Sequence, residues 1–156
     1  MSTKRRLFSV ALTILLAFAA LGCTQTAKTS PVVLTFEGAN KSQMTQAEFL
    51  ALDQVTMELS RTNSKGKTTT GTYSGPLFRD VLEFAGVSEY SSILLIASDG
   101  YENEYTPDIV NDDLTFFTLT ADGEQLTQES GGPVMLCAGN QTANMWAKSV
   151  IKVVAK

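Results

Sequence analysis

The alternation of apolar and polar positions along the chain predicts most of its strands. Residues 55–60 (VTMELS) alternate between the two kinds, which is typical of a half-buried strand. Residues 93–97 (ILLIA) and 134–138 (VMLCA) are apolar throughout and predict strands buried on both faces. β-Branched and aromatic residues favour further strands, and the Thr-rich run favours the edge of a sheet. These further strands are 32–36, 68–73, 114–119 and 149–154.

Helix signals are fewer. Thr45 and Glu48 match a capping box and predict a short helix, with Phe49, Leu50 and Leu52 facing inward. Residues 76–85 (PLFRDVLEFA) carry apolar side chains at helical spacing, with a proline at the start and Gly86 after the end. Turns are expected at 64–67, 99–100 and 122–123. About seven strands with two or three short helices between them predict an α+β fold with a mixed sheet.

The N-terminal residues resemble an export signal. Residues 4–6 are basic, residues 7–20 are uncharged, and small residues precede Cys23, as in the lipobox of bacterial lipoproteins. We therefore expect residues 1–23 to be a lipoprotein signal peptide ending in Cys23, the lipidated residue. Residues 24–31 then form a flexible tether and residues 32–156 one domain, placed outside the cytoplasm and anchored to the membrane by lipid.

Charge and composition exclude several functions. Three of the 12 basic residues and none of the 16 acidic ones lie in the signal, so the remainder has a net charge of −7. Such an acidic domain is unsuited to nucleic acid, whose phosphates require Lys and Arg. The chain has no histidine, which excludes His-dependent nucleophilic catalysis and His-ligated zinc. With Cys23 lipidated, Cys137 has no cysteine to form a disulfide with.

Two local clusters admit a binding role beside a simpler one. Acidic residues crowd positions 99–113, but their spacing does not fit an EF-hand loop, which favours a solvated rim. Arg61, Lys65 and Lys67 could bind a phosphate or could discourage pairing at a sheet edge. Trp146 and the tyrosines could line a pocket or pack at the edge of the core.

The order of several short motifs resembles the molybdopterin-binding domain of the sulfite-oxidase family of oxidoreductases. The motifs are Gly75-Pro76-Leu77, Ser98-Asp99-Gly100-Tyr101, residues 123–126, Gly132-Pro133 and Lys148. The resemblance covers roughly residues 32–154. It implies a mixed-sheet α+β fold and a pocket for a pterin cofactor, with Lys148 near the cofactor's phosphate. It also implies that Asp99 and Tyr101 lie at the rim of the cleft and Arg61 near the loop on the metal side.

The sequence departs from the family at the metal. The family's cysteine ligand follows the strand matched by 55–60, but this chain has Leu59, Ser60 and Arg61 there. An arginine expected after Gly132-Pro133 is also replaced. Cys137 lies instead in an apolar run near the C-terminus, so we interpret it as a packing residue rather than a metal ligand. No metal ligand and no catalytic residue are therefore assigned, and the missing thiolate argues against molybdenum.

These observations predict an exported lipoprotein that binds molybdopterin, a related pterin or another anionic small molecule, or that meets a redox partner in the cell envelope. One alternative is an active molybdenum oxidoreductase with a non-cysteine ligand such as the Ser60 oxygen. Another is a non-catalytic interaction module of the cell surface. The predicted binding residues are Arg61, Lys67, Tyr73, Asp99, Tyr101, Trp146 and Lys148.

Overall fold

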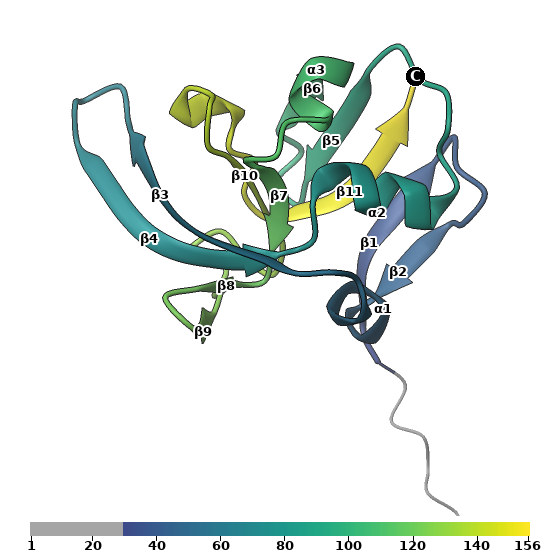
Figure 1. Ribbon diagram of the computed structural model, residues 1–156, viewed down its shortest axis with the longest axis horizontal. Coiled ribbons are helices and arrows are strands. Elements are labelled where there is room, and N and C mark those ends of the chain that lie inside the picture. Colours follow the sequence, from purple (N-terminus) through teal and green to yellow (C-terminus); the bar gives the residue numbers. More distant parts are fainter. Residues whose placement is uncertain (1–29) are drawn as a thin grey trace, which may run out of the picture.

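The computed structural model describes residues 30–156 (Figure 1). The predicted signal peptide, Cys23 and most of the tether lie outside the described residues. Within residues 30–156 the chain forms eleven strands in three sheets, three short α-helices and one 3-10 turn. None of these helices is long and apolar enough to span a bilayer.

A five-stranded sheet forms one side of the domain. Its spatial order is β2 (Gln43–Thr45), β1 (Val32–Glu37), β11 (Val150–Ala155), β5 (Ile93–Ala97) and β6 (Glu102–Tyr105). β1 pairs with β11 in parallel, whereas the other neighbours pair antiparallel. This sheet is therefore mixed, as the sequence predicted. β5 has partners on both sides, in agreement with its apolar run.

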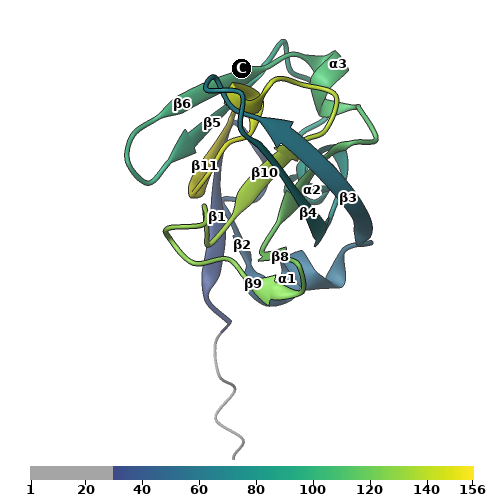
Figure 2. The same ribbon diagram turned by 90° about the vertical axis from the view of Figure 1, so that its left-hand side faces the viewer.

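The second large sheet is built on a long hairpin. β3 (Val55–Thr62) and β4 (Thr68–Gly75) pair over their full length, and β4 continues to β8 (Thr120–Ala121) and β9 (Glu124–Gln125). The hairpin extends away from the rest of the domain (Figure 1). Seen from that side, it crosses in front of β10 (Figure 2). β10 (Met135–Ala138) and β7 (Thr115–Thr118) form the third, two-stranded sheet between the other two.

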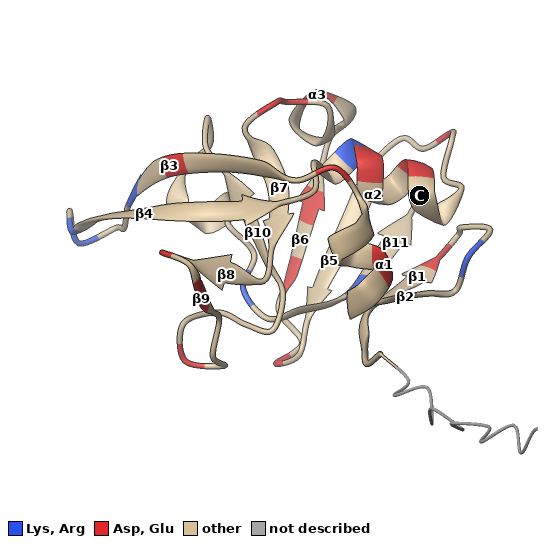
Figure 3. Ribbon diagram, turned by 60° about the horizontal axis from the view of Figure 1, so that its bottom comes forward, with Lys and Arg blue, Asp and Glu red and all other residues tan. Residues whose placement is uncertain are grey.

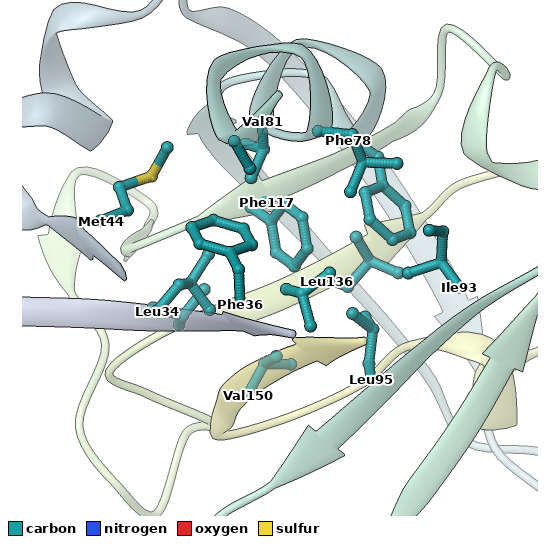
Figure 4. Close-up of a cluster of buried hydrophobic side chains, with 14 of the residues drawn as sticks. Leu34, Phe36, Met44, Phe78, Val81, Ile93, Leu95, Phe117, Leu136 and Val150 are labelled. Atoms are coloured by element: carbon teal, nitrogen blue, oxygen red, sulfur yellow. The ribbon is translucent and has the colours of Figure 1, made fainter. Parts of the chain in front are cut away.

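The main core lies between the five-stranded sheet and α2 (Phe78–Ala85). α2 buries Phe78, Val81, Leu82 and Ala85 against the sheet side chains. Phe78 meets Phe117 edge to face, with ring centroids 4.8 Å apart, and the cluster continues to Leu136 from β10 (Figure 4). All four residues of β10 are buried, which confirms the interpretation of this run.

The first helix, α1 (Gln46–Ala51), has the predicted capping box. The Thr45 hydroxyl accepts from the Glu48 N–H, and the Glu48 carboxylate accepts from the Thr45 N–H. Phe49 is buried as expected, but Leu50 is 55% exposed, so its predicted inward orientation is wrong. A helix of six residues has room for little more than one buried apolar side chain, because successive residues point about 100° apart.

The predictions for β4 and α2 can be compared with the structure in detail. β3 pairs with β4 over its full length, whereas β8 pairs only with Tyr73 and Ser74, so residues 68–71 of the Thr-rich run lie at a sheet edge as expected. α2 begins at Phe78, so Pro76 precedes it; the Pro76 carbonyl accepts from Phe117 N–H and ties the loop to β7. β2 and β6 were not predicted, because their sequences are mostly polar and lack the apolar pattern of a strand. A third short helix, α3 (Pro107–Val110), follows β6.

Candidate functional site

A cleft lies between the β3–β4 hairpin and the segment that leads into β11. Two adjoining cavities occupy it. The first, of about 240 Å³, is lined by three cations together with small polar side chains, and we call it the cation pocket. Its lining is Arg61, Asn63, Lys67, Thr69, Ala143 and Lys148. An anion of phosphate size would meet positive charge from both walls of this pocket.

The second cavity, of about 320 Å³, shares Arg61 and Lys148 with the first. Tyr101 and Trp146 line it along with the Asp99 carboxylate, so we call it the aromatic pocket. Its remaining lining is Ala97, Ala143 and Asn144. Flat apolar surface beside hydrogen-bonding groups suits a heterocyclic ring.

Strand alternation decides which β3 side chains reach the cleft. Arg61 and Leu59 point to the side of the hairpin that faces the cleft and the smaller core, as successive residues of a strand point to opposite faces. Ser60 points to the other face, where its hydroxyl lies 2.6 Å from the Thr70 hydroxyl. Ser60 is therefore not in position to act as a metal ligand in this cleft.

Trp146 connects Arg61 to a small core beneath the cleft. The Arg61 guanidinium carbon lies 5.5 Å from the Trp146 ring centroid, within cation–π range. Tyr73 also packs against Trp146. The two rings meet edge to face, with their centroids 5.5 Å apart. Trp146 is only 4% exposed, and its indole N–H has no hydrogen-bond partner among the described residues. Tyr73 is buried behind Trp146 and lines neither cavity, and burial raises its pKa.

Lys148 enters the cleft from the turn before β11. Its stem packs on Gly131, where a side-chain Cβ would lie 2.9 Å from Lys148 Cγ. The Gly131 carbonyl accepts from the Ser149 N–H, which fixes the backbone beside Lys148. Burial, and then the nearby positive charge of Arg61, lower the Lys148 pKa. Two cations held together in this way favour an anion between them.

Ion pairing separates the cleft cations from the other cations of the domain. Lys41, Arg79, Lys152 and Lys156 each have a carboxylate partner. Four basic residues have no such partner within residues 30–156. Three of them lie on the β3–β4 hairpin, where Figure 3 shows basic positions toward the tip, and the fourth precedes β11 and lines the cleft. They are Arg61, Lys65, Lys67 and Lys148. In a domain with an excess of acidic residues, this uncompensated charge marks the cleft as the place for an anion.

Cys137 lies in the small core beneath the cleft rather than in it. The side chain is fully buried, and its neighbours in that core include Leu59, Phe116 and Trp146. Burial raises the thiol pKa, and the opposing effect of the Arg61 charge is smaller. A neutral, sealed thiol does not ligate a metal. No group of three His, Cys, Asp or Glu side chains within residues 30–156 is arranged to hold one either.

A larger cavity of about 540 Å³ lies elsewhere, beside α2. Its only cation is Arg79, which is already engaged. One Arg79 nitrogen lies 2.8 Å from the Asp113 carboxylate, and another donates to the Asn111 carbonyl. This cavity therefore lacks the free charge that distinguishes the cleft.

The structure brings most of the predicted binding residues together. Arg61, Lys67 and Lys148 line the cation pocket, and Asp99, Tyr101 and Trp146 line the aromatic pocket. Of the predicted binding residues, only Tyr73 lines neither pocket. Sequence reasoning missed the polar and small residues of the lining, which are Asn63, Thr69, Ala97, Ala143 and Asn144. Nothing in their local pattern distinguishes them from ordinary turn and strand residues.

Comparison with known proteins supports the class of this domain. The model of the oxidoreductase molybdopterin-binding domain family matches residues 15–156, and the chain belongs to that family. The fold is similar to that of the sulfane dehydrogenase SoxCD from Paracoccus pantotrophus, with a TM-score of 0.71 at 18% sequence identity. That match covers 80% of this chain and 38% of the other. A search of curated proteins finds no match.

The lining of the cleft suits the phosphate of the family's cofactor but offers no ligand for its molybdenum. Molybdopterin carries a phosphate, and the cation pocket supplies free positive charge for it. The soft thiolate that would hold molybdenum has no counterpart at the cleft, since Cys137 is sealed below it. The residues present therefore fit a pterin-type anion but not a protein-ligated metal.

Proposed function

We propose that this protein binds a phosphate-bearing, pterin-type small molecule in the cleft, without a cysteine bond to a metal. The observation that carries the proposal is the grouping of the unpaired cations. Arg61, Lys67 and Lys148 surround one cavity and Lys65 lies on the same hairpin, while the other four cations of the described domain are paired. The aromatic pocket next to it provides a place for the ring of the same ligand.

The chain's own residues have distinct tasks in this proposal. Lys148 and Lys67 supply positive charge from opposite walls, and Arg61 can use its planar guanidinium both on the phosphate and against Trp146. Asp99 is the carboxylate of the aromatic pocket and can accept from amino or ring N–H groups of a heterocycle. Asp99 already accepts from the Tyr101 backbone N–H, which holds the turn in shape.

The test uses the full-length protein in detergent and two flavins that differ only by a phosphate. FMN carries a pterin-like ring and a phosphate, and riboflavin carries the ring alone. We expect FMN to bind at least about tenfold more tightly by calorimetry, since a charge-assisted contact contributes about 1.5–3 kcal/mol. Lys148→Met should remove this preference, whereas Lys152→Met should keep it because Lys152 pairs with Glu37 on another face. Equal binding of the two flavins would contradict the proposal.

We also propose that the protein is a lipoprotein anchored outside the cytoplasm through Cys23. The lipobox-like residues before Cys23 and the uncharged segment before them support this. Growth with radiolabelled palmitate should label the wild-type protein in the membrane fraction. Cys23→Ser should lose the label, and Cys137→Ser should retain it. Equal labelling of the wild type and Cys23→Ser would refute the anchor.

A further inference from the structure

A patch of exposed apolar side chains surrounds the place where the described chain begins. On α1, Ala47, Leu50 and Ala51 recur at helical spacing, and all three are exposed. Pro31 and Val32, at the start of β1, are exposed as well. Leu50 and Val32, at 55% and 46%, are two of the four large apolar side chains that remain exposed within residues 30–156. We call these five residues the α1 patch.

Hydrogen bonds hold the start of the described chain against α1. The Ser30 hydroxyl accepts from the Ala47 N–H at 2.9 Å, and the Pro31 carbonyl accepts from the Gln46 N–H at 2.8 Å. Figure 1 accordingly shows α1 beside the beginning of β1. The chain therefore enters the domain next to the α1 patch.

The α1 patch carries no charge, although the domain has an excess of acidic residues. Glu48 is the only charged residue of α1, and its carboxylate is engaged by the Thr45 N–H and by the Lys41 ammonium, 3.7 Å away. The next charged residue along the chain is Asp53, beyond the end of the helix. An uncharged apolar surface binds by removing apolar area from water and not by attraction to anionic groups.

The lipid anchor proposed above limits how far this patch can lie from the membrane. Seven residue steps separate Cys23 from Ser30, and a fully extended chain of that length spans at most about 25 Å. A compact domain of the size of residues 30–156 is about 35 Å across. The α1 patch is therefore always within reach of the bilayer surface, whereas the opposite end of the domain reaches it only when the domain lies on its side.

The tip of the β3–β4 hairpin lies at the opposite end of the domain from α1 (Figures 1 and 2). Lys65 and Lys67 lie at this tip, and Arg61 follows on β3. Unpaired cations such as these attract the phosphates of lipid headgroups. A contact between the α1 patch and the bilayer would hold the hairpin tip away from the headgroups and leave the cleft open to solution.

We propose that the α1 patch rests on the phospholipid bilayer, with Leu50 and Val32 at the boundary between headgroups and acyl chains and the hairpin tip facing away. This inference rests on the lipid anchor proposed above and specifies the orientation of the anchored domain. Because the contact is apolar, it requires no anionic lipid, and raising the salt concentration leaves it unchanged.

The experiment measures which part of the full-length protein touches lipid in phosphatidylcholine vesicles. An NBD fluorophore is attached to one added cysteine, and a doxyl-labelled phosphatidylcholine serves as the quencher. Ala51→Cys reports on the α1 patch and keeps Leu50, and Ser64→Cys reports on the exposed hairpin tip. Cys137 is buried, and the protein without an added cysteine provides the blank. We expect quenching of the Ala51→Cys probe to be at least about twice that of the Ser64→Cys probe.

A second substitution tests whether the apolar side chain makes the contact. Leu50→Ser, added to Ala51→Cys, should lower the quenching at that probe. Ile151→Ser is the matched control, because Ile151 is also exposed, at 43%, but lies on β11 outside the patch, and it should leave the quenching unchanged. Equal loss of quenching in both variants would overturn the role given to Leu50.

The remaining outcomes separate this inference from the anchor on which it rests. Equal quenching of the two probes, none at either, or stronger quenching at Ser64→Cys would overturn the orientation while the anchor stands. A probe at Ala51→Cys that is shielded from water but not quenched by lipid would show that a protein covers the patch, which also overturns it. If Cys23→Ser takes up as much palmitate label as the wild type, the anchor fails and the inference fails with it.

Discussion

The guanidinium carbon of Arg61 lies 5.5 Å from the ring centroid of Trp146, the single tryptophan of the chain. This contact joins the cation pocket to the small core, because Arg61 lines the cavity while Trp146 packs against Tyr73 below. An anion that attracts Arg61 must compete with the aromatic ring for its charge. The contact therefore gives the cleft an intrinsic spectroscopic reporter.

Binding of pyrophosphate should change the emission of Trp146. Because the chain has no other tryptophan, the tryptophan emission arises from Trp146 alone. A fluorescence titration should show a saturable change in the wild type and little change in Arg61→Met. Arg79→Met is the control, since Arg79 is paired with Asp113 far from the cleft residues. A full signal in Arg61→Met would mean that Arg61 does not transmit binding.

Anion affinity should fall in alkaline solution as Lys148 loses its proton. Burial and the Arg61 charge lower the Lys148 pKa in the free protein, and a bound anion raises it again. Below the lowered pKa, Lys148 is already charged and affinity is constant. Above it, binding requires proton uptake and weakens as the pH rises.

Phenyl phosphate is a suitable probe for this effect, because it remains a dianion throughout the alkaline range. Its affinity should be flat at neutral pH and should decline as the pH increases. Lys148→Arg should shift the decline to higher pH, since arginine stays protonated. A profile that is identical in both proteins would assign the titration to another group.

The Cys137 thiol should be unreactive in the folded protein. It is fully buried and burial raises its pKa, so little thiolate forms and reagents cannot reach it. In a Cys23→Ser protein, Ellman's reagent should titrate no thiol in the native state and one thiol in guanidinium chloride. The double variant Cys23→Ser, Cys137→Ser should show none in either condition. Rapid reaction of native protein that Cys137→Ser abolishes would show an accessible, functional thiol.

Two glycines should respond very differently to alanine. At Gly75 an added Cβ would lie 1.7 Å from the Phe117 carbonyl oxygen, so β4 and β7 would have to separate. Gly75→Ala should lower the free energy of unfolding by about 3 kcal/mol. Gly66→Ala meets no neighbour within 4 Å and has only its positive φ of 76° to strain, which costs about 1 kcal/mol. Urea denaturation measures both, and equal losses would contradict this packing.

Sequence patterns succeeded where a single local cause decides the structure. The apolar runs at 93–97 and 134–138 could lie only in the interior, and the Thr45–Glu48 pair is a self-contained cap. The predicted inward orientation of Leu50 was wrong because a helix of six residues has a narrow buried face. Only Tyr73 of the Thr-rich run 68–73 acquires a second neighbouring strand, β8, a two-residue strand about 50 residues away that no local pattern indicates.

The sequence allowed the residue types of the site to be predicted, but not how those residues are arranged in space. Cations and aromatic residues have a recognisable chemistry, so Arg61, Lys148 and Trp146 could be nominated from the sequence. Whether Arg61 faces the cleft depends on the register of β3 with β4, where Arg61 is opposite Thr69. The grouping of Asn63 and Asn144 in one cavity follows only from the approach of the hairpin tip to the turn near Ala143. That approach is a long-range property of the fold.

The most direct measurement is the content of pterin and molybdenum in the full-length protein, purified from a host that makes the molybdenum cofactor. The account predicts a phosphate-bearing pterin that is released on denaturation, depends on Lys148 and is accompanied by far less than one molybdenum atom per chain. One molybdenum atom per chain, with an X-ray absorption signature of a sulfur ligand that disappears in Cys137→Ser, would contradict it.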